Sequence, residues 1–365
     1  MSKISSYQLF TITVLFQLGT TIIFGFAAST GRDAWIVTLI SGIIGLGIIS
    51  IYIGLMKMNS GLSLVEWYPK QFGKWIGTPI SLMYPCIFLF DAGRIVGDLR
   101  DLIPTTLLPN TPPYIITIVF IFVVVYGLYL GIQNIARLGE VLVPIIFILF
   151  VIEIILLIFS QILDFKYLKP MLWDGWLPVM KAVFPEGISQ TYGETIALAM
   201  LWPLAHRQER IWKVTIYSTS VVTLFFIISD LMAIATFDDV LFKRNIYPLY
   251  SLTGLVNISG FITNINAFVV VYFISTAYIK LFIKVFAALT AIQILLRMES
   301  YRPLIWPSAV IVMVLGFIVS TNITEHIYIL AIERTTPFVW VPLFLVFPSI
   351  LFIVSYIRTR TNKSQ

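Results

Sequence analysis

The chain has 365 residues, of which 59% are hydrophobic and 12% are charged, and its mean hydropathy is +0.94. Ordinary soluble domains are about 45–50% apolar and about 25% charged, so this composition excludes a soluble protein and predicts one that spans a bilayer. The net charge of +6 lies in short segments between apolar runs, which excludes a basic face that binds nucleic acid.

The apolar runs predict an all-α integral membrane protein. A spanning helix needs about 20 mostly apolar residues, a rule that predicts about ten spans here. No soluble domain interrupts the series, so residues 1–365 are expected to form a single membrane domain. The predicted spans lie near 7–29, 34–56, 78–103, 114–131, 139–160, 177–204, 211–235, 263–290, 303–320 and 337–357.

The connections predict the orientation, because Lys and Arg collect in cytoplasmic segments. If the N-terminus is inside, the inner segments hold Lys3, Lys57, Lys70, Lys74, Arg137, Arg207, Arg210, Lys213, Lys280, Lys284, Arg297, Arg302, Arg358, Arg360 and Lys363. The outer segments then hold Arg32, Lys166, Lys169, Lys181, Lys243, Arg244 and Arg334. This bias predicts that both termini are cytoplasmic.

Ten spans divide into two sets of five, which predicts a 5+5 inverted repeat because five is odd. The first repeat would cover about 7–160 and the second about 177–357. In such repeats, discontinuous helices flank a site near the midplane. The first span contains Gly19-Thr20-Thr21, and the sixth contains the polar run from Pro185 to Glu194. A polar run in a bilayer must face protein or water, so helices 1 and 6 are expected to be discontinuous.

Charged residues within the predicted spans are candidate functional groups, because ionised groups are costly there. Asp91, Arg94 and Asp98 share one face of the third span. They predict either a mutual salt-bridge network or a gating or ligand contact. Glu194 lies beside the sixth break. It could stay protonated, accept a ligand amine, pair with Arg94 or lock two helices together.

Several short motifs follow one another in a fixed order and spacing over nearly the whole chain. They are Gly19-Thr20-Thr21, Arg94, Leu108-Pro109-Asn110-Thr111-Pro112, Gly131-Ile132-Gln133-Asn134-Ile135-Ala136-Arg137, Tyr192-Gly193-Glu194 and Trp202-Pro203. In this order the chain resembles the spore germinant-receptor B subunits, or spore permeases. That family is part of the amino acid–polyamine–organocation superfamily, which has a LeuT-like fold.

The resemblance implies a nutrient sensor in the inner membrane of a bacterial spore, with no cofactor. The family works with an A-type membrane subunit and a C-type lipoprotein, and its B subunit binds a small germinant, often an amino acid. Half-helix amides would hold the ligand carboxylate. Alternatively, the polar groups at the breaks satisfy one another. The expected ligand-binding residues are Gly19, Thr20, Thr21, Gly187, Ser189, Gln190, Thr191, Tyr192, Gly193 and Glu194.

Other polar residues of the spans carry more general expectations. Ser275 and Thr276 resemble the paired hydroxyls of the superfamily's sodium site. They are therefore a candidate weak cation site, although Ser and Thr also bond back to their own helix. Glu153 in the fifth span and Asp230 in the seventh are isolated acids, and for both a structural lock and a proton relay stay open.

The sequence argues against an enzyme. The histidines, His206 and His326, fall near opposite membrane faces, so one chain cannot form a two-histidine metal site or a serine triad. The leading hypothesis is a germinant-binding receptor subunit. The alternatives are an ion-coupled amino-acid transporter and a scaffold that binds no ligand and only assembles partner subunits.

Overall fold

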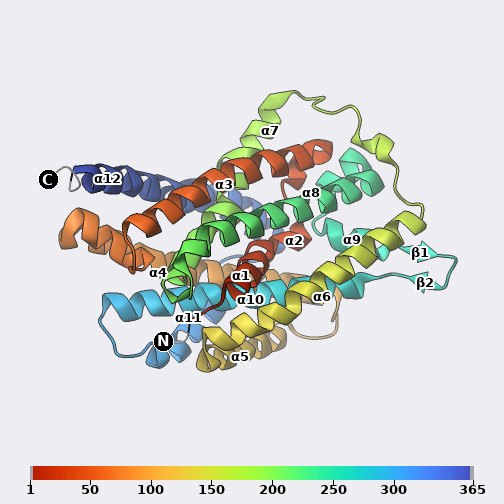
Figure 1. The fold of residues 1–365 in the computed structure, drawn as a ribbon. Coiled ribbons are helices and arrows are strands. Elements are labelled where there is room, and N and C mark those ends of the chain that lie inside the picture. The colour runs from red at the N-terminus through yellow and green to blue at the C-terminus, as the bar shows by residue number, and fades with distance from the viewer. Residues whose placement is uncertain (1–2, 362–365) are drawn as a thin grey trace.

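The computed structural model describes residues 3–361, so that Lys363, one of the charges assigned to the inner side, lies outside the described residues. The described chain is a bundle of helices, drawn in Figure 1, with one short antiparallel hairpin of β1 (Asn257–Ile258) and β2 (Ile262–Thr263). The expectation of an all-α membrane protein is confirmed.

The α-helices differ widely in length. They are α1 (Ser6–Leu18), α2 (Thr21–Phe24), α3 (Ala34–Met58), α4 (Leu64–Thr106), α5 (Pro113–Leu130), α6 (Ile132–Phe159), α7 (Trp176–Ala182), α8 (Ile211–Arg244), α9 (Pro248–Gly254), α10 (Asn266–Leu295), α11 (Ile305–Ile318) and α12 (Phe347–Thr361). The other helical segments have 3-10 or π geometry: η1 (Ala28–Asp33), η2 (Phe165–Leu168), η3 (Val183–Tyr192), η4 (Gly193–Met200), η5 (Trp202–Leu204), η6 (Gln208–Arg210), η7 (Arg302–Leu304) and η8 (Glu325–Val346).

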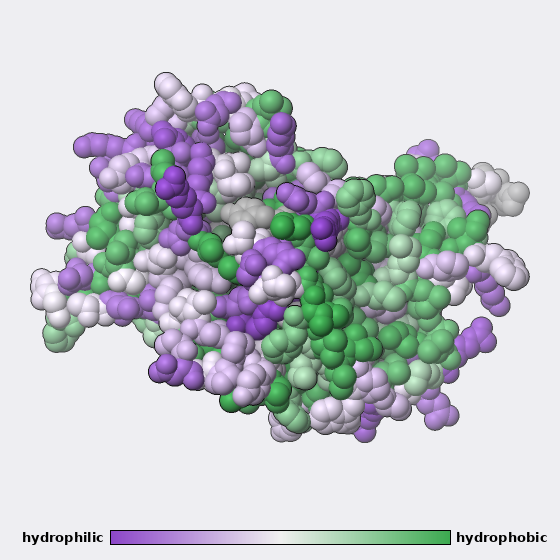
Figure 2. All heavy atoms as spheres, turned by 180° about the vertical axis from the view of Figure 1, so that it is seen from behind, coloured by the Kyte–Doolittle hydropathy of each residue, from purple (hydrophilic) through white to green (hydrophobic). Residues whose placement is uncertain are grey.

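Seven helical segments of the described chain are long and apolar enough to cross a membrane. They contain α3, α4, α5, α6, α8, α10 and the continuous pair η8–α12. The other predicted spans correspond to the pair α1–α2, to the segment from α7 to η4 and to the shorter apolar helix that contains α11. In Figure 2 hydrophobic residues cover a broad part of the face, and hydrophilic residues gather toward the end that carries the loops.

The first predicted span is broken as expected. α1 begins with a capping box, in which Ser5 and Gln8 bond each other's backbone amides, and it ends at Leu18. Gly19 follows with φ +44° and ψ −139°, a conformation that glycine tolerates because it has no β-carbon. The short helix α2 starts only at Thr21. The break therefore lies at Gly19 and Thr20.

The sixth predicted span is interrupted at a different residue from the one expected. Within η3 only Phe184 is non-helical, with φ −123° and ψ 129°. It precedes Pro185, and a proline ring disfavours helical geometry in the residue before it. The interruption was expected within the polar run from Pro185 to Glu194. That run is instead helical, with π and then 3-10 geometry. The break thus lies before the polar run.

Several predicted boundaries were also displaced. α4 begins at Leu64 and turns sharply at Gly73, which has φ +76°, before it enters the predicted third span. The last span begins at Glu325 rather than near 337. In Figure 1 both ends of the described chain lie toward the same end of the bundle, and α9 and the β1–β2 hairpin lie toward the other.

The helices are enclosed to very different degrees. In the most apolar stretch of α10, 67% of the residues are buried, whereas in that of α6 the share is 28%. α10 packs against both α1 and α4. It therefore lies at the centre of the bundle, where its side chains reach the break in the first span.

Candidate ligand-binding site

A hollow opens beside the break in the first span. It has about 980 Å³ of empty space, counting the part that is open to solvent. It extends from the break past Ser29 to Asn245, toward the end of the bundle opposite the chain termini (Figure 1). Its lining residues are Thr20, Thr21, Phe24, Gly25, Ala27, Ala28, Ser29, Asp91, Arg94, Ile95, Asp98, Glu186, Gln190, Glu194, Lys243, Asn245, Ile246, Lys280, Ile327, Ala331 and Ile332.

The structure brings only part of the expected ligand-binding set to this hollow. Thr20 and Thr21 line it from the first break, and Gln190 and Glu194 line it from the sixth segment. From the third span it receives the expected charges Asp91, Arg94 and Asp98. The other expected residues are not among its lining: Gly19, Gly187, Ser189, Thr191, Tyr192, Gly193, Glu153, Asp230, Ser275 and Thr276.

Helical geometry explains the selection in the sixth segment. Glu186, Gln190 and Glu194 are four residues apart, so they share one helix face, and all three line the hollow. The wider expectation took all the polar residues beside the break together and did not select one helix face. Glu186 was not among the expected site residues, although its spacing from Gln190 and Glu194 was a usable signal once the segment is taken as helical.

The residues between them pack against neighbouring helices. The Tyr192 hydroxyl lies 2.9 Å from Oγ1 of Thr223, and the Gly193 carbonyl accepts a hydrogen bond of 3.2 Å from the Tyr52 hydroxyl. The Oγ1 atoms of Thr191 and Thr21 are 3.5 Å apart, which joins the two interrupted segments. Ser189 is buried, and its hydroxyl has no hydrogen-bond partner among the described residues.

A buried cluster of four charges lies at the inner wall of the hollow, and three of its members, Asp91, Glu194 and Lys280, line it. Nζ of Lys284 lies 2.6 Å from Oδ2 of Asp91 and 3.1 Å from Oε2 of Glu194. Nζ of Lys280 lies 3.2 Å from the same Glu194 oxygen. All four side chains are buried, and charges inside a membrane protein require such partners.

The positions of the two lysines correct the sequence analysis, which counted Lys280 and Lys284 among the cytoplasmic charges. Both lie within α10 and point into the bundle, where each contacts a carboxylate. The sequence carried a signal for this buried position. The two lysines are four residues apart on a long apolar helix, so they share one face, which lysines at a helix end need not do. Lys280 also packs so closely against Gly19 that a β-carbon at position 19 would overlap the lysine side chain.

The expected network of Asp91, Arg94 and Asp98 was wrong in its pairings. Asp91 pairs with Lys284 and accepts a hydrogen bond of 3.0 Å from Nε1 of Trp340. Oδ1 of Asp98 lies 3.1 Å from Nε2 of His326. Within residues 3–361 no carboxylate lies within ion-pair distance of Arg94, so the pair with Glu194, one of the alternatives left open for that acid, does not form either.

Arg94 instead lies over an aromatic ring. Its guanidinium carbon is 4.8 Å from the ring centroid of Trp340, a cation–π geometry. Its Nε is buried and has no hydrogen-bond partner among the residues that the structure describes. The guanidinium is therefore held in place at the hollow with hydrogen-bonding capacity unused.

The candidate cation site is closed by a direct hydrogen bond. Oγ1 of Thr276 lies 2.6 Å from the carbonyl oxygen of Gly19 and 2.8 Å from that of Tyr272. Ser275 is half-buried on the same helix. The hydroxyl and the carbonyl that were expected to share a cation thus bind each other, and the role of Ser275 and Thr276 as a cation site stays a prediction.

The isolated acids lie away from the hollow, each with one hydroxyl donor. Oε2 of Glu153 accepts a hydrogen bond of 2.9 Å from Tyr272, and Oδ2 of Asp230 accepts one of 2.7 Å from Thr38. Both carboxyl groups are buried. They join α6 to α10 and α8 to α3, and the choice between lock and relay stays open.

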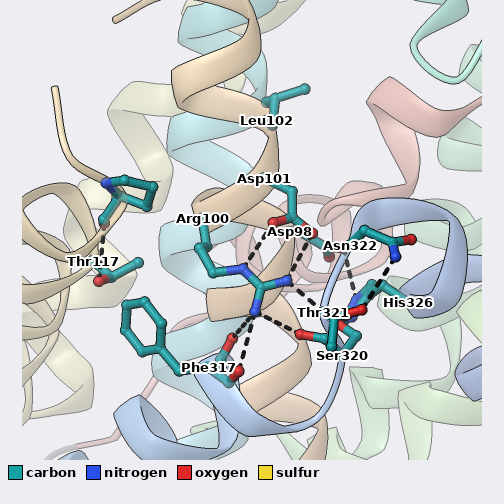
Figure 3. Close-up of polar contacts among 12 residues, drawn as sticks. Asp98, Arg100, Asp101, Leu102, Thr117, Phe317, Ser320, Thr321, Asn322 and His326 are labelled. Carbon is teal, nitrogen blue, oxygen red and sulfur yellow. Dashed lines mark hydrogen bonds and ion pairs between the residues drawn. The ribbon is translucent and has the colours of Figure 1, made fainter. Parts of the chain in front are cut away.

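A second polar cluster, shown in Figure 3, borders the hollow through Asp98. Arg100 pairs with Asp101, with Nε 2.7 Å from Oδ1, and its Nη1 donates to the carbonyl oxygens of Gly316 and Ser320 at 3.0 and 2.8 Å. His326 contributes its Nδ1, 3.0 Å from the Ser320 hydroxyl. Arginine here satisfies free carbonyls at the C-terminal end of α11, a role that the sequence analysis did not assign.

Comparison with known proteins agrees with the motifs. Residues 3–326 match the family model Spore_permease, described as "Spore germination protein". Over 365 residues the chain is 26% identical to spore germination protein KB of Bacillus subtilis (strain 168), which covers 100% of this chain and 98% of that protein. It is 26% identical over 257 residues to spore germination protein YndE of the same organism, covering 70% of each chain. It is 25% identical over 240 residues to spore germination protein B2, covering 64% of this chain and 63% of that one. The chain therefore belongs to the spore permease family of spore germination proteins.

Proposed function

We propose that this protein is the germinant-binding subunit of a bacterial spore nutrient receptor. In this proposal it recognises a small nutrient, for which an amino acid is the expectation, in the hollow beside Thr20 and Thr21. Occupancy would then trigger germination through an A-type membrane subunit and a C-type lipoprotein. The protein would lie in the inner membrane of the spore, with both termini in the cytoplasm.

The observation that carries the proposal is the hollow at the broken first span. Within a membrane, unpaired backbone groups and charged side chains occur only where they contact protein or water. Here the break at Gly19 and the polar face of Glu186, Gln190 and Glu194 converge on one space within an apolar bundle. Family membership supports the role in spore germination.

The proposed architecture has ten spans in a 5+5 inverted repeat. α1–α2, the segment from α7 to η4, and α11 are counted as spans together with the seven long helices. The repeats would cover about 7–160 and about 177–357. The interrupted helices then open the two halves, as in transporters whose site lies between inverted repeats.

The proposed signal is a change in the packing around the hollow. A ligand that contacts Thr20, Thr21 and Gln190 would favour an arrangement in which the interrupted segments close against α4 and α10. The shift is limited to the ligand's difference in affinity for the two arrangements. The outer surfaces of the moving helices would pass this change to the A-type subunit.

Direct binding tests the proposal. Calorimetric titration of the full chain in lipid nanodiscs, with the standard amino acids and D-glucose as probes, is expected to show saturable binding of at least one probe. In spores, Thr20→Val and Glu194→Gln are expected to raise the nutrient concentration needed for germination. If no probe binds, alone or with the partner subunits, and both variants germinate as the parent does, the chain has no nutrient site of this kind.

Proteoliposome uptake separates sensing from transport. We expect the bound probe not to accumulate in vesicles that contain the chain alone, with or without a proton or sodium gradient. Gradient-driven, saturable accumulation would instead favour the ion-coupled amino-acid transporter. Binding without accumulation supports the sensor.

A further inference from the structure

The charged side chains that line the hollow fall into two classes. Most of them already have a partner within the protein. Asp91 and Glu194 pair with Lys284, Lys280 pairs with Glu194, Asp98 lies 3.1 Å from His326, and Lys243 lies 3.0 Å from Asp239. Arg94 and Glu186 form the second class, because in residues 3–361 neither has an ion-pair partner and they do not pair with each other.

Arg94 offers a fixed site for an anionic group. Trp340 holds its guanidinium at 4.8 Å, and Trp340 is itself fixed by its hydrogen bond to Asp91. A planar guanidinium presents a fork of N–H donors that matches a carboxylate. The Nε of Arg94 is buried without a partner among the described residues, and leaving a buried donor unpaired costs free energy. The helix α2 has only 4 residues, so its dipole is a weaker anion partner than this full charge.

Glu186 offers the complementary charge. It lies on the same helix face as Gln190 and Glu194 and lines the hollow with them, and its side chain is half-buried. No hydrogen bond to its carboxylate occurs among the described residues. A half-buried carboxylate without a partner favours a cationic group, above all an ammonium that donates hydrogen bonds.

We infer that the hollow binds a zwitterion, with Arg94 contacting its anionic group and Glu186 its cationic group. This inference rests on the proposed function and narrows its ligand to molecules that carry both charges, of which an amino acid is the simplest. The buried cluster of Lys280, Lys284, Asp91 and Glu194 at the inner end of the hollow has equal numbers of positive and negative charges. A zwitterion adds no net charge to it, and so leaves no unpaired charge in the membrane interior.

Calorimetry with modified amino acids tests the two contacts separately. The probes are the standard amino acids and, for one that binds, its primary amide and its N-acetyl derivative. We expect the wild-type chain in nanodiscs to bind both derivatives about 10- to 100-fold more weakly than the amino acid, because each leaves one charged group of the protein unpaired. D-Glucose is expected not to compete.

The variants assign each contact to its residue. Arg94→Gln is expected to weaken binding of the amino acid by a similar factor and to leave the affinity of the primary amide unchanged. Glu186→Gln is expected to weaken binding of the amino acid and to leave the affinity of the N-acetyl derivative unchanged. Arg32→Gln and Glu299→Gln, which lie outside the hollow, are the matched controls and are expected to bind the amino acid as the wild type does.

The outcomes distinguish this inference from the proposed function. If an amino acid or glucose binds and both variants weaken all probes equally, or weaken none, the zwitterion contacts are wrong although a nutrient site exists. If no probe binds the wild type, both proposals fail. Arg94→Lys keeps the charge without the fork, so it provides the arginine test if Arg94→Gln does not fold, and Glu186→Gln tests the other contact independently.

Discussion

Lys284 holds two carboxylates at the centre of the bundle. Its ammonium lies 2.6 Å from Asp91 and 3.1 Å from Glu194, and its side chain is fully buried. Lys280 contacts only Glu194 of these two acids. The two lysines are therefore unequal: without Lys284, Asp91 loses its ionic partner, whereas without Lys280, Glu194 keeps one.

Replacing Lys284 should destabilise the protein more than replacing Lys280. Removing one partner from a buried ion pair costs about 3–5 kcal/mol, because the other charge stays buried without compensation. We expect Lys284→Met to lower the melting temperature, followed by tryptophan fluorescence of the purified chain, clearly more than Lys280→Met does.

A double variant provides the control. Asp91→Asn combined with Lys284→Met removes both charges of one pair, and the remaining Lys280–Glu194 pair is intact. This double variant should be more stable than Lys284→Met alone. Two results would contradict the unequal roles of the lysines. One is a double variant whose loss of stability equals the sum of the two single losses, and the other is a loss for Lys280→Met as large as that for Lys284→Met.

At the level of residues, the sequence identified the acids more readily than their partners. Asp91 and Glu194 are conspicuous as charges within apolar spans. Lys280 and Lys284 lie in a predicted span whose polar pattern is irregular, and the rule that cytoplasmic segments are basic assigned them to a membrane surface. That rule concerns loops, so it gives no information about cations that pair inside a bundle. Arg94 was placed at the site, but its aromatic partner Trp340 is far away in sequence and could not be predicted.

At the level of elements, composition predicted that the first and sixth segments are interrupted. The position of the interruption followed from composition only in the first, where Gly19 alone tolerates the observed backbone. In the sixth, the polar run concealed the fact that Pro185 disturbs the residue before it. The π and 3-10 geometry that follows depends on packing against α3 and η8, which a local pattern does not contain.

Cysteine labelling distinguishes a helical sixth segment from an unwound one. Gln190 lines the hollow, and its neighbour Ser189 is fully buried. In a Cys86→Ser background, Gln190→Cys is expected to react with a water-soluble maleimide, because the reaction requires a hydrated thiolate. Ser189→Cys, a nearly isosteric change, is expected to react far more slowly, as measured by mass spectrometry.

Denatured protein gives the reference for complete labelling of both cysteines. The comparison concerns adjacent residues, so differences in expression or membrane depth cancel. Equal labelling of the two positions in the native chain would show that the segment is not helical there, and would remove the reason for assigning Glu186, Gln190 and Glu194 to one face.

At the level of the whole molecule, the hollow is open on one side and closed on the other. Behind the residues that line it, buried tyrosines cross-link the helices: Tyr52 donates to the carbonyl oxygens of Gly193 and Phe344, and Tyr84 donates to that of Leu343 at 2.8 Å. The Gln17 amide adds bonds of 2.9 and 3.0 Å to Thr195 and Thr219. In the proposed function, a ligand would therefore enter and leave from the side of the loops.

The helical, membrane-spanning character of the chain followed from composition alone, because apolar length decides it. The seven long helices all overlap predicted spans. The same rule also predicted spans near 7–29 and 177–204, where the structure has the interrupted segments α1–α2 and α7 to η4, and these segments border the hollow. The candidate site therefore lies where helix length alone says least about the local backbone.

The sidedness of the hollow is the final prediction. Ser29 is exposed at the hollow, and Thr359 is exposed near the opposite end of the bundle. In a Cys86→Ser background expressed in intact cells, Ser29→Cys is expected to react with a membrane-impermeant maleimide, and Thr359→Cys only after lysis. The charge bias of the connections predicts this orientation, which places the open side of the hollow outside the cell membrane. Labelling of Thr359→Cys but not Ser29→Cys in intact cells would show that the topology is the reverse of the predicted one. The hollow would then face solutes of the cytoplasm rather than nutrients that arrive from outside.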